Sequence, residues 1–247
     1  MAVTLSRTET IARLTFGDEG QLNLLSVDLI QTLQTQLNAL AEDDTLKVLI
    51  LSGAGPKAFS AGAHMEELVH LKDPQAYVEM GQELMRTLET FPVPVLAAIQ
   101  GYALGAGFSL ALACDLRVAS TRAKMGQLAV RNGLIPPFGN VQRLIQAIGA
   151  SRTRELTFTG RTLKGEDLLH WGLCHQVVAP EDLEAAVTAL AEEIALSPTY
   201  AVRLVKQIID QTLEEGYAVG YARQEDALSY CLSHPQSGEI MRGFLKA

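Results

Sequence analysis

The chain lacks several features that would place it in a specialised class of protein. Its 247 residues include only three cysteines, an odd number without the paired spacing of a metal site. No apolar run approaches the ~18 residues that a membrane-spanning helix needs. The first residues lack the basic region and long apolar stretch of a secretory signal, so we expect a cytoplasmic protein with no membrane partner.

Positive charge is also scarce. The chain has 20 lysines and arginines against 28 aspartates and glutamates, which gives a formal net charge of −8. A nucleic-acid partner is therefore not expected, since binding to a phosphate backbone requires an excess of cations. Hydrophobic residues make up 48% of the chain, enough for a substantial core, and the length predicts one domain.

Strand-like and helix-like segments alternate along the first part of the chain. Ser26 precedes apolar residues at helical spacing and predicts a capped helix that ends near Glu42. Together the segments are typical of an α/β fold with parallel strand pairing. Apolar runs predict strands at 3–5, 11–16, 48–52, 95–99, 116–119 and 174–178.

The second part of the chain is predicted to be almost wholly helical. We accordingly divide the chain into a core of residues 1–195 and a C-terminal helical region of residues 196–247 within the same domain. The predicted helices after Val141 cover 142–148, 151–159, 165–170, 181–196, 199–215 and 220–233.

Two turns built from small residues follow buried strands and are the most informative feature of the sequence. The first is Phe59-Ser60-Ala61-Gly62-Ala63, and the second runs from Gly101 to Gly107 into a helical stretch at 108–113. A strand, a bare turn and a helix start leave backbone N–H groups free to bind one anionic oxygen. This pattern predicts an oxyanion hole for an enolate. The alternative is that the glycines only let a helix pack tightly on a sheet.

Five motifs in family order resemble the crotonase, or enoyl-CoA hydratase/isomerase, superfamily. The resemblance runs from about Asn23 to Phe244 and implies a spiral of ββα turns. It also implies that the C-terminal helical region packs homotrimers, often paired as hexamers. The motifs are 58–63, 98–108, 114–119, 132–136 with Gln142-Arg143-Leu144, and Thr159-Gly160-Arg161 with Trp171-Gly172-Leu173.

The resemblance implies which residues stabilise the oxyanion. The N–H groups of Ala63 and Ala106 would be the two donors, although the family usually has glycine at the second position. Gly105 and Gly107 would flank the second donor in the substrate pocket. A methyl group on Ala106 leaves its N–H in place but narrows the approach.

The resemblance also implies how the substrate is carried. The pantetheine arm of an acyl-CoA or acyl-carrier-protein thioester would lie along Phe59, Ala61 and Met65. Phe244 and Lys246, near the end of the chain, would reach the adenosine part of coenzyme A. No separate cofactor and no metal are implied, because coenzyme A or phosphopantetheine is part of the substrate.

The two glutamates with which the family's hydratases activate water and deliver a proton have no counterpart in this sequence. The matching positions hold Ser109 and Ala129. A serine without a partner is a poor general base, and alanine carries no acid or base at all. An ordinary hydratase is therefore not expected.

Other side chains near the motifs could supply substitute chemistry. His64 follows Ala63, where it either titrates near neutral pH in the site or turns toward solvent. Arg131 either binds a substrate carboxylate in the pocket or forms a surface salt bridge. Ser109 either hydrogen-bonds a substrate or a water, or fills space. Phe138 either faces the pocket and limits the acyl group, or fills the core.

The sequence thus favours a lyase or isomerase that acts on an acyl thioester through an enolate. Decarboxylation or double-bond isomerisation of an enoyl thioester needs little acid–base help. The family's polyketide β-branching decarboxylases likewise lack both glutamates. The alternatives are a weak enoyl-CoA hydratase, with a water held by Ser109 and His64, and a non-catalytic crotonase-fold subunit that binds thioesters.

Overall fold

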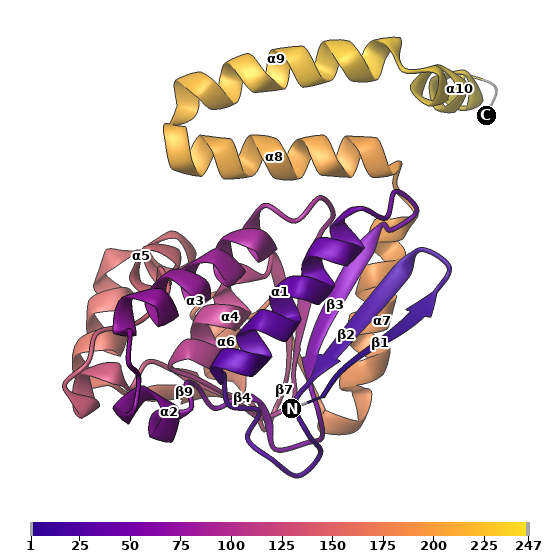
Figure 1. Cartoon of the computed structure of the whole chain (residues 1–247). Coiled ribbons are helices and arrows are strands. Elements are labelled where there is room, and N and C mark those ends of the chain that lie inside the picture. The colour runs from indigo at the N-terminus through magenta and orange to yellow at the C-terminus, as the bar shows by residue number, and fades with distance from the viewer. Residues whose placement is uncertain (1, 246–247) are drawn as a thin grey trace. The chain divides into compact units, whose positions relative to one another are not determined.

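The computed structural model describes residues 2–245, apart from the side chain of Phe244. The chain folds into two compact units, the first ending at Leu196 and the second beginning at Ser197 (Figure 1).

A six-stranded sheet runs through the first unit. Neighbouring strands pair in parallel except for the β1–β2 hairpin, which turns at Glu9 in the left-handed conformation (φ 41°). The strands, in their order across the sheet, are β1 (Val3–Thr8), β2 (Ile11–Phe16), β3 (Val48–Gly53), β5 (Val95–Ile99), β7 (Leu116–Ser120) and β10 (Gln176–Val178). The predicted parallel α/β arrangement is confirmed.

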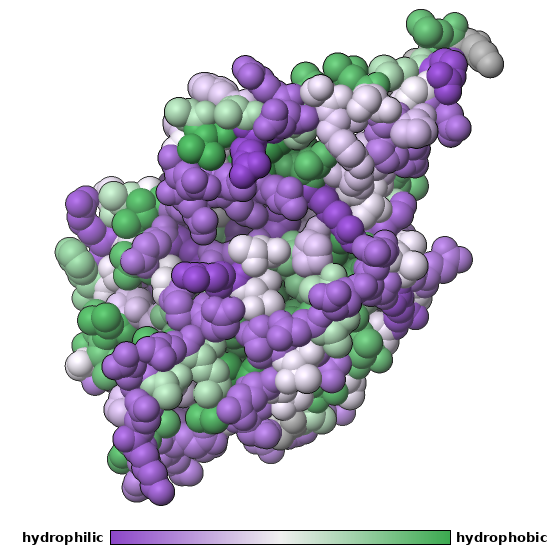
Figure 2. Space-filling model, turned by 45° about the horizontal axis from the view of Figure 1, so that its top comes forward, coloured by the Kyte–Doolittle hydropathy of each residue, from purple (hydrophilic) through white to green (hydrophobic). Residues whose placement is uncertain are grey.

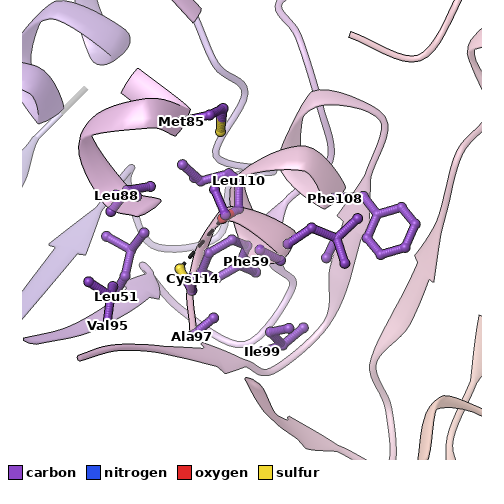
Figure 3. Packing of buried hydrophobic residues seen from close by; sticks show 14 of the residues in the cluster. Leu51, Phe59, Met85, Leu88, Val95, Ala97, Ile99, Phe108, Leu110 and Cys114 are labelled. Atoms are coloured by element: carbon purple, nitrogen blue, oxygen red, sulfur yellow. Dashed lines mark hydrogen bonds between the residues drawn. The ribbon is translucent and has the colours of Figure 1, made fainter. Parts of the chain in front are cut away.

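Helices cover both faces of this sheet. The strands β3 and β5 are apolar on both faces, so both need such a cover, and all of their residues are buried. Leu49 and Leu51 face one side, where α1 (Val27–Ala41), α3 (Pro74–Glu89) and α4 (Ala106–Ala113) pack. Figure 3 shows Leu51, Met85 and Leu110 meeting in this core. Val48 and Ile50 face the other side and contact α7 (Leu183–Ala195).

A second, small sheet lies beside the first and was not predicted. Its strands pair in parallel except for β8 with β9. In order they are β4 (Ala58–Ser60), β6 (Tyr102–Leu104), β8 (Lys124–Gly126) and β9 (Thr162–Lys164). The chain passes from a strand of the large sheet to one of the small sheet and then to a helix. This ββα progression confirms the expected crotonase-type spiral.

The predicted helices are present, with ends that shift by up to three residues, whereas α3 was not predicted. Ser26 caps α1, and its Oγ accepts a hydrogen bond from Leu29 N at 3.1 Å. The two helices predicted between 142 and 159 are both found within α5 (Asn140–Thr159), separated at Gly149, whose backbone (φ 73°, ψ 163°) is not helical. The shorter elements are α2 (Met65–Val69), η1 (Ala129–Asn132), α6 (Glu166–His170) and η2 (Pro180–Asp182).

The second unit consists of α8 (Thr199–Glu215), α9 (Tyr217–Ser233) and α10 (Pro235–Phe244). A Cβ on Gly220 would lie 2.1 Å from Thr212 Oγ1, so α8 and α9 approach closely there. Hydrophilic residues cover most of the surface visible in Figure 2, and hydrophobic ones lie between them in small groups. Within the described residues, no helix has the length and apolar character to cross a membrane.

Candidate active site

The parallel pairing of β4 with β6 brings the two glycine-rich turns side by side. Gly62 (φ 116°) and Gly105 (φ 54°) adopt conformations that favour glycine. A Cβ on Gly62 would lie 2.9 Å from Leu104 O and 3.7 Å from Ala106 N. The residue before Ala63 therefore lies next to the N–H of Ala106.

Both candidate donors point away from the hydrogen-bond ladders around them. Leu25 N donates to Gly62 O (2.8 Å) and His64 N donates to Leu25 O (3.3 Å), a parallel bridge that leaves the N–H of Ala63 on the opposite side. Ala106 is the first residue of α4, where an N–H has no partner within the helix. Among residues 2–245, neither N–H has a hydrogen-bond acceptor.

Close packing holds α4 against the first turn. A Cβ on Gly107 would lie 2.1 Å from Ser60 O, so only glycine allows this approach. Gly105 N donates to Gly126 O at 3.1 Å, which ties the second turn to β8. The side chains of α4 are all buried, and the helix places the positive end of its dipole at Ala106.

Three buried or half-buried amide side chains support the two turns and were missed in the sequence. Gln100 Nε2 donates to Ala58 O at 3.0 Å, and Asn23 Nδ2 donates to the same carbonyl at 2.8 Å. The fully buried Gln127 approaches Gly105 O with its Nε2 at 3.5 Å. Only Gln100 has a signal in the sequence, because it directly follows the apolar strand β5.

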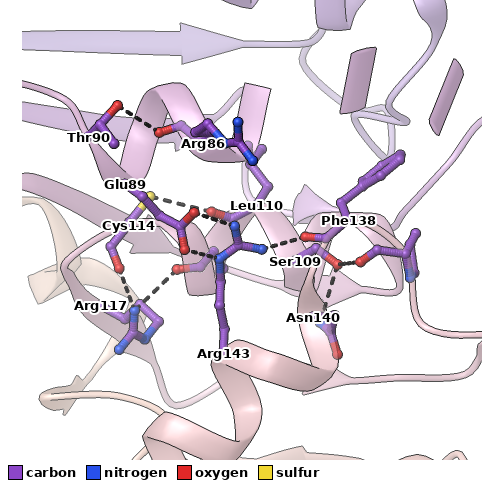
Figure 4. Close-up of polar contacts among 12 residues, drawn as sticks. Arg86, Glu89, Thr90, Ser109, Leu110, Cys114, Arg117, Phe138, Asn140 and Arg143 are labelled. Carbon is purple, nitrogen blue, oxygen red and sulfur yellow. Dashed lines mark hydrogen bonds and ion pairs between the residues drawn. The ribbon is translucent and has the colours of Figure 1, made fainter. Parts of the chain in front are cut away.

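Ser109 is completely buried, and its hydroxyl is hydrogen-bonded to other groups of the chain (Figure 4). Its Oγ lies 2.9 Å from Pro137 O and 3.3 Å from Gly105 O, and it accepts a hydrogen bond from Asn140 Nδ2 at 3.2 Å. The partners of this hydroxyl are backbone carbonyls and an amide, none of which is a base that could activate it, so Ser109 is a poor general base for water. At position 129, the backbone N–H donates to Gln127 Oε1 (3.3 Å), and the side chain of Ala129 is a methyl group.

His64 lies directly after the first donor and is half-buried at the start of α2. Its Nδ1 is buried and has no partner among the described residues. Tyr77 was missed as a neighbour, and its hydroxyl donates to Leu25 O (3.4 Å), the carbonyl that also accepts His64 N. Burial, with a smaller effect of the Glu67 charge, raises the pKa of Tyr77 to about 12. Tyr77 is therefore protonated at neutral pH.

Phe138 and Arg131 make their contacts outside the two turns. The Phe138 ring is buried against the Tyr77 ring, with centroids 5.7 Å apart, and a Cβ on Gly81 would lie 2.2 Å from it. The ring therefore fills the core. The exposed Arg131 donates from Nε to Thr159 O (3.0 Å) at the end of α5, in place of the surface salt bridge that was one alternative.

The residues expected to hold the pantetheine arm differ in exposure. Phe59 is fully buried against Phe16 in an edge-to-face contact, so only its backbone is available to a ligand. Ala61 N donates to Leu22 O, and Met65 is 48% exposed. The side chain of Phe244 and all of Lys246 lie outside the described residues.

Metal chemistry finds no support in the described part of the chain, since no group of three histidine, cysteine, aspartate or glutamate side chains is placed to hold an ion there. The candidate site consists instead of backbone donors, one half-buried histidine and one buried tyrosine.

Comparison with known proteins identifies the class to which this fold and these turns belong. The family described as enoyl-CoA hydratase/isomerase matches residues 6–246. The chain therefore belongs to the enoyl-CoA hydratase/isomerase family, within the crotonase superfamily.

Several members of this family are similar over nearly the whole chain. The short-chain-enoyl-CoA hydratase of Clostridium acetobutylicum is 31% identical over 246 residues, which cover 99% of this chain and 94% of that protein. The crotonyl-CoA hydratase of Syntrophomonas wolfei is also 31% identical, covering 99% and 95%. The crystal structure of an enoyl-CoA hydratase from Bacillus anthracis superposes with a TM-score of 0.94 at 34% identity, covering 99% and 96%.

Proposed function

We propose that the protein is an acyl-thioester enzyme in which the N–H groups of Ala63 and Ala106 bind the thioester oxygen and stabilise an enolate. The observation that carries this proposal is that both N–H groups lack an acceptor among residues 2–245 and lie on two turns that approach each other at Gly62. Donors of this kind act on charge that develops in the transition state, and each is worth about 3–4 kcal/mol. Membership of the enoyl-CoA hydratase/isomerase family supports a coenzyme A thioester as substrate.

The reaction that fits these side chains best is decarboxylation or double-bond isomerisation of an enoyl thioester. The hydroxyl of Ser109 is hydrogen-bonded and Ala129 is apolar, so neither supplies the base that water addition needs. In decarboxylation the C–C bond to the carboxylate breaks and CO₂ leaves. The electron pair of that bond enters the enolate, and a proton from solvent then adds to carbon. No side chain has to remove a proton in this reaction. Isomerisation does need a base that moves a proton from one carbon to another, and His64, next to Ala63, is the side chain that would supply it.

Hydration is the second candidate, because relatives of this chain are named as enoyl-CoA hydratases. In this case a water would be held beside His64, whose Nδ1 lacks a partner among the described residues. The double substitution Ser109→Glu/Ala129→Glu would restore both acids and should raise water addition at least tenfold. Unchanged hydration in a folded double variant would count against this candidate.

The decisive experiment is mass spectrometry of crotonyl-CoA and methylglutaconyl-CoA, each incubated with the protein in D₂O. Loss of CO₂ with uptake of deuterium would establish the decarboxylase. Deuterium exchange or a double-bond shift without a change of composition would indicate the isomerase. Gain of water by crotonyl-CoA would establish the hydratase. No change in either thioester would contradict a coenzyme A substrate and favour either a carrier-bound thioester or a subunit that only binds thioesters.

We also propose that the chain forms a homotrimer or a hexamer through its C-terminal helical unit. Val205, Ile209 and Leu213 repeat at intervals of four residues along α8, and each is more than half exposed. Such a stripe is typical of a helix face that another element covers. Light scattering coupled to size-exclusion chromatography tests the proposal, and a monomer at micromolar concentration would contradict it.

A further inference from the structure

Acidic residues are almost absent from a continuous third of the chain. Between Glu89 and Glu166, 76 residues include only two acids, Asp115 and Glu155, against nine lysines and arginines. The rest of the chain has eleven cations and 26 acids, so a protein of net charge −8 concentrates its positive charge in one segment. Three of the four strands of the small sheet, β6, β8 and β9, belong to this segment.

The outer face of the small sheet lines up two of these cations. Tyr102, Lys124 and Lys164 are register partners on adjacent strands, so their side chains share one face. All three are exposed, and Lys124 Nζ lies 5.4 Å from the centre of the Tyr102 ring. Arg122 is also exposed, two residues before Lys124. The opposite face of the sheet is buried and carries Ala103, Met125 and Leu163.

Other cations of the segment, unlike these two lysines, are paired with carbonyls or carboxylates of the chain. The buried Arg117 donates to backbone carbonyls, and Arg143 pairs with Glu89. Arg161 pairs with Glu155. Within residues 2–245, neither Lys124 nor Lys164 has a carboxylate partner. Because no neighbouring carboxylate neutralises these two exposed ammonium groups, their positive charge attracts an acidic surface.

This face lies beside the candidate active site. The strand β6 that carries Tyr102 leads through Gly105 to Ala106, and at about 3.3 Å per residue these four steps span at most about 13 Å. The strand β8 that carries Lys124 ends at Gly126, whose carbonyl accepts the N–H of Gly105. A long flexible arm anchored outside this face therefore has a short way to the two donors.

We propose that the lysine face, formed by Tyr102, Arg122, Lys124 and Lys164, docks an acidic protein that carries the acyl thioester on a pantetheine arm. The proposal rests on the proposed function, because the docked carrier would deliver its thioester to Ala63 and Ala106. The cations supply recognition of the acidic carrier, and the backbone donors supply the chemistry. A nucleic acid is the less favoured occupant, since the chain as a whole repels phosphate backbones.

The test uses the double substitution Lys124→Glu/Lys164→Glu. Binding of a recombinant acidic acyl carrier protein, loaded with a crotonyl-phosphopantetheine arm, is measured by fluorescence anisotropy at low and high salt. The double variant should bind about tenfold more weakly at low salt, and the difference should shrink at high salt. The KM for a methylglutaconyl N-acetylcysteamine thioester, which has neither carrier nor phosphates, should not change.

The control is the double substitution Lys72→Glu/Arg223→Glu, which changes the net charge by the same amount at two exposed positions elsewhere. It should bind the carrier as the wild-type protein does. The proposal is overturned if the wild-type protein binds no carrier or if the control loses as much affinity. An equal rise in the KM for methylglutaconyl-CoA would overturn it too, and would assign the lysines to the phosphates of coenzyme A. Tighter binding of duplex DNA than of the carrier would also contradict it.

Turnover of the N-acetylcysteamine thioester separates the two proposals. If the methylglutaconyl and crotonyl N-acetylcysteamine thioesters are both inert while the carrier still binds through the lysine face, the enzyme proposal fails and the docking surface stands. If the small thioesters react and the lysine substitutions leave carrier affinity unchanged, the docking surface fails alone.

Discussion

Asn140 donates a hydrogen bond from its Nδ2 to Ser109 Oγ across 3.2 Å and so joins the first residue of α5 to the middle of α4 (Figure 4). Both residues are completely buried. The same serine donates to Pro137 O, which places the turn before α5 against the helix that begins at Ala106. Ser109 thus connects two helices through its hydroxyl.

Ser109→Ala tests this structural use of the hydroxyl. The substitution leaves Pro137 O and Asn140 Nδ2 without their partner, so the free energy of unfolding should fall by about 1–3 kcal/mol in urea titrations. Ser233→Ala, which removes an exposed hydroxyl bonded within α9, should change it by less than about 0.5 kcal/mol. A large loss of turnover with unchanged stability would show instead that Ser109 acts on the substrate.

Ala106→Pro tests the second donor. Proline has no N–H, yet the first position of a helix tolerates it because that N–H has no partner within the helix. The variant should fold and lose about 10²–10³-fold in kcat. Ala106→Ser keeps the N–H and serves as the matched control for a change of side chain. Equal activity of the proline and serine variants would exclude Ala106 as a donor.

Phe138 is buried, although its backbone has a conformation that residues with a side chain rarely adopt. Its φ of 59° lies in the left-handed region, while its ring packs on Tyr77. Phe138→Ala should lower the free energy of unfolding by about 3–5 kcal/mol through the lost ring. Phe138→Gly should be about 1 kcal/mol more stable than the alanine variant, since glycine adopts positive φ without strain. The reverse order in thermal unfolding would show that the turn at Phe138 is unstrained.

His175 makes the fold sensitive to acid. Burial, together with the charge of Arg117, lowers the pKa of His175, whose Nδ1 accepts a hydrogen bond from Arg117 N at 3.1 Å. The unfolded chain therefore binds a proton at a higher pH than the folded chain does. The stabilisation is present above the unfolded pKa of about 6.5 and is lost as the pH falls through the folded value.

The substitution His175→Asn checks this pH dependence, because asparagine keeps an acceptor for Arg117 N but does not titrate. Urea unfolding at neutral pH and near pH 5 should show a larger loss of stability for the wild-type protein than for the variant. Equal losses would mean that other groups carry the acid sensitivity.

The central strands of the large sheet were predictable because each is a continuous apolar run. Val48–Gly53 and Val95–Ile99 are buried on both faces, and such runs stand out from their neighbours in the sequence. The small sheet was missed because its strands have three residues each, too few to show an alternating pattern. The division of 140–159 into two helices was predictable from Gly149, whose backbone leaves the helical conformation at that point.

The candidate site was predictable only as far as it is local in the sequence. The two turns carry their own pattern of glycine and alanine, and the structure places them side by side. The partners of Ser109 come from Pro137 and Asn140, about thirty residues away, and those of Phe138 come from α3. Contacts at such separations depend on how the spiral closes, which no local pattern records.

The proposed oxyanion site has an unusual resistance to mutation. Its two donors are main-chain atoms that the bridge to Leu25 and the start of α4 hold in position. Among single substitutions, proline alone deletes such a donor outright, so most exchanges at positions 63 and 106 leave the anion-binding capacity in place. At positions 109 and 129, by contrast, any substitution changes the chemical group itself, because that group belongs to the side chain. A scaffold of this kind lets a lineage exchange its acids and bases, and hence its reaction, while it keeps the machinery that holds the carbonyl.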